Sequence, residues 1–214
     1  MASNTRKIGV IICSTRKPRA CPQITNFVVQ TIQTYVREGT EPASAPTLHT
    51  IDLEELDLPI FNESGVPSQI FNHDEYDHEH TRKWSILVQG FDAFIFVVPQ
   101  YNWGYPAVVK NAIDYLYNEW KGKPAMIVSY GGKGGGRCAA QLRQVLCGVR
   151  MIPTQKSVEL AFPGRDILLQ AASGHDLKLD GTSSSGIWSD QRKNIISAYS
   201  ELVKLMSSNV SISE

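Results

Sequence analysis

Three short apolar runs constrain the fold of this chain most strongly. The runs KIGVIIC (7–13), AFIFVVP (93–99) and PAMIVSY (124–130) are apolar almost throughout and show no regular polar alternation. Strands of this kind are typical of a parallel sheet that is covered on both faces. We therefore expect three buried strands of an α/β fold.

Segments with helical spacing separate and follow these runs. Four amphipathic helices are predicted where apolar residues recur at intervals of three and four, in 24–36, 108–116, 142–146 and 195–206. Residues 47–53 predict a further strand, 81–90 a short helix and 151–160 a weaker last strand. The alternation predicts a doubly wound, five-stranded parallel sheet with helices on both faces.

Two stretches show neither pattern. Residues 61–80 are polar and rich in turn formers, and residues 163–186 contain several glycines and the sequence TSSSG. Both are predicted to be long loops, which in compact domains are usually functional or mobile. Because the 214 residues show no break in composition, the chain is expected to form one domain, 1–214.

Charge and hydropathy argue against several classes of partner. Lysine plus arginine and aspartate plus glutamate number 21 each, so no net field attracts nucleic acid or an anionic membrane. The most apolar run, 93–98, stops at Pro99, far short of the ~18 to 20 residues that span a bilayer. The first residues lack the pattern of a secretory signal. A cytoplasmic protein without nucleic-acid or membrane partners is expected.

The four cysteines, Cys13, Cys21, Cys138 and Cys147, are scattered without a C-x-x-C pair. A chain of this length needs no disulfide staples, so free thiols are predicted. Cys13 ends an apolar run and Cys147 continues a helical one, and we expect both to be buried.

Candidate binding residues follow three of the predicted strands. After the first strand, hydroxyls at Ser14 and Thr15 and guanidinium groups at Arg16 and Arg19 precede a helix. Such groups, with the unpaired N–H groups of a helix start, suit a phosphate. The lack of a G-x-x-x-x-G-K-[ST] motif favours a monophosphate over a triphosphate. The alternative is an ordinary helix start with surface arginines.

The other two strand ends suit a planar ring. PQYNWG (99–104) combines two side-chain amides with two aromatic rings, and the backbone N–H groups around Asn102 and Gly104 are candidate donors. GGKGGG (131–136) lets the backbone approach a ligand closely. The alternatives are a turn that only covers the sheet edge, and a flexible connector or weak G-x-G-x-x-A dinucleotide fingerprint.

Parallel strands bring their carboxyl ends to one edge of the sheet, so these three turns are expected to meet. Together they predict a mononucleotide site, and the amides and aromatic rings favour a flavin. The motifs STRKPR (14–19), PQYNWGYPAVVKNAIDYL (99–116) and SYGGKGGG (129–136) resemble the NADPH-dependent FMN reductase family. This family is flavodoxin-like and includes quinone and azo-dye reductases. The resemblance implies a flavodoxin-like FMN-binding domain that pairs as a homodimer.

The resemblance also assigns residues to the cofactor FMN. The FMN phosphate would be held by Ser14, Arg16, Arg19 and Gln23. The isoalloxazine would lie between Pro99, Gln100, Tyr101, Asn102 and Trp103 on one side and Gly131 and Gly132 on the other. Many relatives have glycine and glutamate where this chain has Cys13 and Gln100.

The expected activity is that of an NAD(P)H-dependent FMN or quinone reductase. The flavin would pass hydride from the nicotinamide donor to quinones or similar acceptors, because no side-chain nucleophile or acid pair is evident nearby. Arg82, Arg137 and Arg165 are candidates for the 2′-phosphate of NADPH, although a surface charge is the commoner role. Two alternatives stay open: a flavin-binding electron carrier or redox-controlled partner protein with little turnover, and an NAD(P)-binding oxidoreductase without flavin.

NHDEYDHEH (72–80) gathers histidines and acids in one short stretch. It lacks the H-E-x-x-H spacing that places two histidines on one helix face, so a solvated polar loop is predicted rather than a metal site. The alternative is a pH-sensitive or adventitious metal site.

Overall fold

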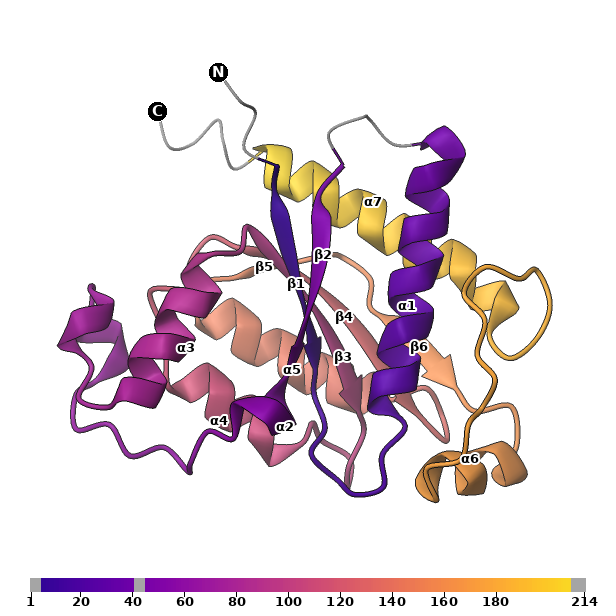
Figure 1. Cartoon of the computed structure of the whole chain (residues 1–214), viewed down its shortest axis with the longest axis horizontal. Coiled ribbons are helices and arrows are strands. Elements are labelled where there is room, and N and C mark those ends of the chain that lie inside the picture. The colour runs from indigo at the N-terminus through magenta and orange to yellow at the C-terminus, as the bar shows by residue number, and fades with distance from the viewer. Residues whose placement is uncertain (1–4, 41–44, 209–214) are drawn as a thin grey trace.

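The computed structural model describes residues 5–40 and 45–208 and confirms the predicted doubly wound sheet (Figure 1). The strands are β1 (Lys7–Ile12), β2 (Thr47–Asp52), β3 (Ala93–Pro99), β4 (Pro124–Gly131), β5 (Ile152–Pro153) and β6 (Val158–Ala161). Every pairing between these strands is parallel, in the order β2-β1-β3-β4-β5, and β6 also pairs with β4. This order is the flavodoxin-like one, which places ligands at the carboxyl ends of the strands.

The predicted last strand, 151–160, is two strands in the structure. β5 and β6 both pair with β4, so the sheet has six strands rather than five. Between them the Thr154 hydroxyl donates to the Lys156 carbonyl (3.1 Å), and the Arg143 guanidinium donates to the Thr154 carbonyl (2.6 Å). These side-chain contacts form a turn that interrupts the ladder.

Helices cover both faces of the sheet (Figure 1). The helices are α1 (Cys21–Tyr35), α2 (Leu53–Leu56), α3 (Glu79–Gln89), α4 (Ala107–Asp114), α5 (Gly136–Gly148), α6 (Arg165–Ala172) and α7 (Arg192–Ser208). Alternate strand residues such as Val10 and Ile95 pack with α1 and α7, whereas Ile11 and Phe94 pack with α3, α4 and α5. This two-sided burial explains the unbroken apolar runs. None of the helices within 5–40 and 45–208 combines the length and apolarity needed to cross a bilayer.

The two predicted loops differ from each other. We call residues 57–78 the outer loop; it contains only short 3₁₀ turns, Pro67–Gln69 and His73–Glu75, before α3 begins at Glu79. We call residues 163–188 the wall segment. The prediction of a loop is wrong there for Arg165–Ala172, which forms α6 because Ile167, Leu168 and Ala171 lie at helical intervals and pack on the core.

All four cysteines are free thiols, as predicted. Cys13 is buried as expected, but the expectation for Cys147 is wrong because it lies on the exposed side of α5. That the whole chain, 1–214, forms one domain stays a prediction, since 1–4, 41–44 and 209–214 lie outside the described residues.

Candidate functional site

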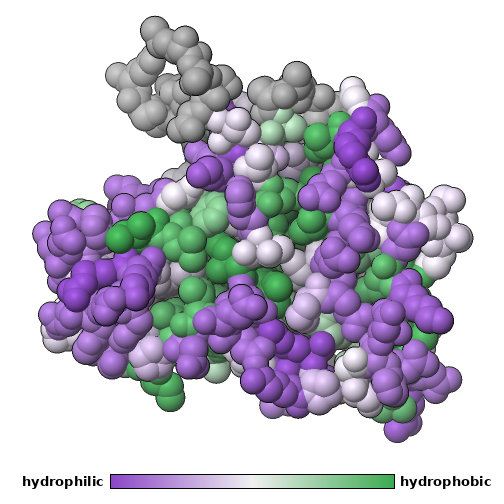
Figure 2. Space-filling model, in the orientation of Figure 1, coloured by the Kyte–Doolittle hydropathy of each residue, from purple (hydrophilic) through white to green (hydrophobic). Residues whose placement is uncertain are grey.

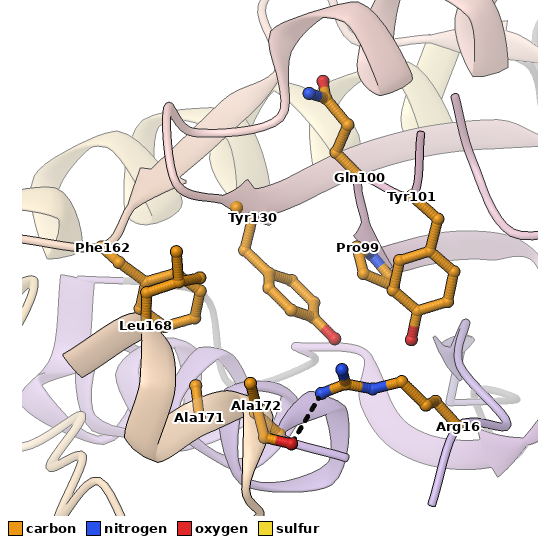
Figure 3. Close-up of a pocket in the computed structure, with 11 residues that line it drawn as sticks. Arg16, Pro99, Gln100, Tyr101, Tyr130, Phe162, Leu168, Ala171 and Ala172 are labelled. Carbon is orange, nitrogen blue, oxygen red and sulfur yellow. Dashed lines mark hydrogen bonds between the residues drawn. The ribbon is translucent and has the colours of Figure 1, made fainter. Parts of the chain in front are cut away.

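The three predicted turns meet at one cavity of about 170 Å³ at the carboxyl ends of β1, β3 and β4 (Figure 3). The turns supply Arg16, Ala20, Pro99, Gln100, Tyr101, Tyr130 and Gly131. The opposite side is closed by Phe162, which follows β6, and by Leu168, Ala171 and Ala172 of α6. The lining is mainly aromatic and aliphatic, so the cavity suits an apolar planar group with few polar contacts.

The turn after β1 presents unpaired backbone donors. Residues 15–18 are exposed, and none of the backbone N–H groups of residues 14–17 donates to another described residue. The Ser14 hydroxyl is buried and lies 2.7 Å from the Tyr101 hydroxyl, which joins this turn to the one after β3. Free N–H groups at such a turn are a ready site for an anion.

The two arginines of this turn have different surroundings. Arg16 lines the cavity and donates to the Ala172 carbonyl (3.1 Å; Figure 3). Arg19 donates to both carboxylate oxygens of Asp52 (2.8 and 2.6 Å) and pairs with Glu54 (2.5 Å). The hydrogen bond to Asp52 raises the pKa of Arg19, so the guanidinium stays charged and fastens the turn to the end of β2.

Gln23 is also engaged by the protein. Its amide donates to the His175 carbonyl (3.0 Å) and accepts from the Leu177 backbone N–H (2.9 Å). Gln23 therefore holds the wall segment against α1. Phosphate contacts from Arg19 and Gln23 stay predictions, and either contact would have to share a side chain that already has protein partners.

The turn after β3 is closed by two backbone hydrogen bonds between Tyr101 and Gly104, each 2.9 Å long. The expectation that the Gly104 N–H is a ligand donor is therefore wrong. Asn102 and Trp103 lie between them with left-handed backbones (φ 46° and 72°), and neither of their N–H groups donates to a described residue. Trp103 is 61% exposed and lies outside the cavity lining.

Gln100 reaches the cavity without pointing its amide into it. Figure 3 shows its side chain turned away from Tyr101, Tyr130 and Arg16. The amide oxygen accepts from the Cys138 backbone N–H (3.3 Å), which ties this turn to the start of α5. A hydrogen bond from the Gln100 amide to a ring stays a prediction.

The glycine turn after β4 contributes Gly131 to the cavity lining, whereas Gly132 lies outside the lining. A side chain at Gly131 would meet Gln100, and one at Gly132 would meet Leu168, at ordinary contact distances of 3.6 and 3.7 Å. The backbone requires glycine further along, at Gly134 and Gly135, where φ is 83° and 81°.

Sequence reasoning missed several lining residues. Tyr130 carries a weak signal, because it is an aromatic residue at a strand end directly before the glycine turn. Phe162 and Leu168 carry none, since they reach the site only through the wall segment.

Burial raises the pKa of Cys21 to about 11 and that of Cys138 to about 12, so these thiols stay protonated and do not act as nucleophiles at neutral pH.

The stretch 72–80 is organised around hydrogen bonds. The buried Glu63 carboxylate accepts from the backbone N–H groups of Asp77 (2.8 Å) and His78 (3.1 Å), and Arg82 donates to the Tyr76 carbonyl (2.7 Å). In the part of the chain that the structure describes, no three histidine, cysteine or acidic residues are placed to hold a metal ion.

Comparison with known proteins agrees with this geometry. Residues 6–163 match the family described as NADPH-dependent FMN reductase. An NAD(P)H-dependent FMN reductase of Saccharomyces cerevisiae is 46% identical over 149 residues, 68% of this chain and 75% of that one. A quinone reductase of Escherichia coli is 31% identical over 126 residues, 56% of this chain and 60% of that one. The flavoenzyme NAD(P)H:(acceptor) oxidoreductase of Paracoccus denitrificans shares the fold (TM-score 0.63, 20% identity, 95% and 98% coverage). The chain therefore belongs to the NADPH-dependent FMN reductase family, oxidoreductases that use NAD(P)H as electron donor and FMN as flavin.

Proposed function

We propose that this chain binds FMN at the strand-end cavity and uses it to pass electrons from NAD(P)H to quinones or similar acceptors. The observation that carries the proposal is the convergence of three separate turns on one cavity at the carboxyl edge of the sheet. The residues there are of the kinds that FMN requires: unpaired N–H donors, an arginine, and an apolar aromatic lining.

The phosphate of FMN would lie on the turn after β1. The backbone N–H groups of residues 14–17 and the Arg16 guanidinium would donate to the phosphate. The hydrogen bond between the Ser14 and Tyr101 hydroxyls holds this turn against the turn after β3. A cavity of about 170 Å³ takes part of the planar ring, so the phosphate end would occupy the exposed surface beside it.

When bound, FMN accepts a hydride from NAD(P)H and delivers two electrons to the acceptor. Pro99, Tyr101 and Gly131, which line the cavity, would hold and orient the ring. The N–H groups of Asn102 and Trp103, which donate to no described residue, would be available as donors for negative charge on the ring. Burial raises the pKa of Tyr130, so its hydroxyl stays protonated and adds no negative charge.

The acceptor is proposed to be a quinone or similar planar molecule. Phe162, Leu168 and Ala171 give the cavity an apolar side, which favours such an acceptor over a charged one. The E. coli relative that carries the name quinone reductase supports the same class.

The visible spectrum of the purified protein tests the proposal first. The protein is incubated with FMN, desalted, and mixed anaerobically with NADPH and then with a quinone. Retained flavin should bleach with NADPH and recover with the quinone. Flavin that is retained but not reduced would contradict the proposed activity, and loss of flavin on desalting would contradict the proposed site.

The substitution Arg16→Ala tests the phosphate contact. We expect FMN affinity to fall by about 1.5 to 3 kcal/mol, as for a lost charge-assisted hydrogen bond. Titration calorimetry with FMN measures this, and Arg37→Ala, an exposed arginine beyond the end of α1, is the matched control. Unchanged FMN affinity would remove Arg16 from the site.

A homodimer in the cytoplasm completes the proposal. The outer loop and α3 expose large apolar residues, among them Ile60 (89%), Phe71 (75%) and Ile86 (52%). Figure 2 shows hydrophobic residues gathered over the middle of one face, beside the outer-loop end, which is mostly hydrophilic in this view. Light scattering of wild type and Phe71→Ser tests the dimer, and a monomeric wild type at micromolar concentration would contradict it.

The proposed cytoplasmic location agrees with the exposed free thiol of Cys147, which suits a reducing compartment.

A further inference from the structure

Trp103 and Arg137 form a cation–π pair between the turn after β3 and the start of α5. The Arg137 guanidinium lies 4.3 Å from the centroid of the Trp103 indole ring. Trp103 belongs to the turn after β3, and Arg137 is the second residue of α5, directly after the glycine turn. The same two turns contribute Tyr101 and Gly131 to the cavity lining, so the pair belongs to the two segments that border the cavity.

Trp103 is held in a conformation that bulky residues seldom adopt. Its φ is 72°, in the left-handed region. It is 61% exposed, whereas Trp84, Trp120 and Trp188 are 1%, 0% and 6% exposed. Backbone strain of this kind concentrates at ligand-binding sites, and an indole kept in water offers a flat apolar face to a ligand.

Arg137 differs from the other two arginines near the site. Arg16 donates to the Ala172 carbonyl, and Arg19 is paired with two carboxylates. No residue within the described ranges forms a hydrogen bond or salt bridge with Arg137. Its N–H donors are therefore available, and the planar guanidinium binds phosphate through paired hydrogen bonds.

We propose that the Trp103–Arg137 pair docks the nicotinamide dinucleotide, with Arg137 on a phosphate and Trp103 against a flat ring of the adenosine half. The inference rests on the proposed function, because it needs a donor that reaches a flavin in the cavity. A dinucleotide is long and anionic, so a site that takes its nicotinamide at the flavin must hold the adenosine half outside. The pair provides the charge and the flat face for that half.

The test is Arg137→Ala in the FMN-loaded protein, with initial rates for NADPH and NADH and a quinone as acceptor. We expect the KM for NADPH to rise about tenfold or more, since a charge-assisted hydrogen bond is lost. Flavin content and the KM for the quinone should not change. If the KM rises for NADPH alone, Arg137 binds the 2′-phosphate. If the KM rises equally for NADH, Arg137 binds the pyrophosphate. Arg137→Lys should recover part of the effect, and Arg37→Ala should show none.

Acrylamide quenching gives a readout without turnover, because Trp103 is the exposed tryptophan of the four. NADP⁺ should protect it in the FMN-loaded wild type and not in Arg137→Ala. Unchanged KM for both donors and no protection would overturn the inference, as would an altered oligomeric state in Arg137→Ala with unchanged KM. If NADPH fails to reduce the wild-type flavin, the proposed function is at fault instead. Protection of Trp103 from acrylamide by NADP⁺ still decides whether the pair binds the dinucleotide.

Discussion

The outer loop (57–78) and the wall segment (163–188) are both rich in polar and turn-forming residues, yet they attach to the molecule in opposite ways. Carboxylates hold the outer loop from within: Glu63 accepts two backbone N–H groups and Glu119 accepts the Tyr76 hydroxyl (3.0 Å). Among its apolar and aromatic side chains, Ile70 and Tyr76 are buried in the core, whereas Ile60 and Phe71 are exposed to solvent. The loop thus keeps its shape without burying those side chains, which leaves them available to a second chain.

The wall segment is held mainly by apolar side chains that point inward, together with the two hydrogen bonds of Gln23. Ala171, Leu177 and Trp188 are buried against α1 and the sheet, and Leu168 reaches the cavity. The backbone lies so close to α1 that a Cβ on Gly181 would come within 2.5 Å of the Phe27 carbonyl. Similar compositions therefore give an outward surface in one region and one side of the ligand cavity in the other.

Removal of the Trp188 ring should have the largest effect. The ring packs against Phe27 and Phe162 at centroid distances of 6.1 and 5.2 Å, and its N–H donates to the Ala161 carbonyl (2.6 Å). We expect Trp188→Ala to lower the free energy of unfolding by about 3 to 5 kcal/mol in urea titrations. Trp188→Phe, which keeps a ring and loses the hydrogen bond, should lose about 1 kcal/mol. If both variants lose equally little, apolar packing does not hold the wall segment.

The corresponding test of the outer loop is Tyr76→Phe. The ring stays buried, while the Glu119 carboxylate loses one donor and keeps the Ser85 hydroxyl (2.6 Å). The expected loss in unfolding free energy is about 1 to 2 kcal/mol. Tyr117→Phe, on the neighbouring turn, should change stability by no more than about 0.5 kcal/mol. An unchanged Tyr76→Phe variant would mean that the loop does not depend on this network.

How well the sequence predicts a feature of this fold depends on how far apart along the chain the interacting residues lie. The strands that line the site are visible as apolar runs, because a buried parallel strand must be apolar on both faces. α6 is short and lies between Gly164 and Gly174, so the three apolar residues that it packs on the core do not stand out from a loop.

The site follows the same rule. Its turns are predicted because each directly follows a strand, but the actual partners of Arg19 and Gln23 are not. Asp52 and His175 lie 33 and 152 residues away from them, and no local pattern reports such a contact. Arg19 is therefore fastened to β2, and Gln23 to the wall segment, for reasons visible only after folding.

The smallest predicted effect is that of acid, which should loosen the outer loop and the start of α3 but not the wall segment. His80 of α3 stacks on His78 (5.1 Å, 12°) and meets the edge of Tyr115. Burial, with His78 adding to it, lowers the pKa of His80, whereas Glu63 opposes the shift. Because folding lowers the pKa of His80, the imidazole binds its proton more tightly in the locally unfolded state than in the folded one. The contribution of neutral His80 to stability is therefore present above the ordinary value of about 6.5 and is lost as pH falls below it.

Hydrogen exchange at pH 7.5 and 5.5, corrected for intrinsic rates, measures this difference. Peptides from the outer loop and the start of α3 should lose protection at pH 5.5, and peptides from the wall segment should not. His80→Gln should remove the pH dependence, since glutamine does not titrate in this range. His175→Gln, which changes the exposed histidine of the wall segment, should leave it intact. Equal loss of protection in both regions would mean that the whole fold responds to pH. The outer loop and the wall segment would then differ in their contacts but not in their response to acid.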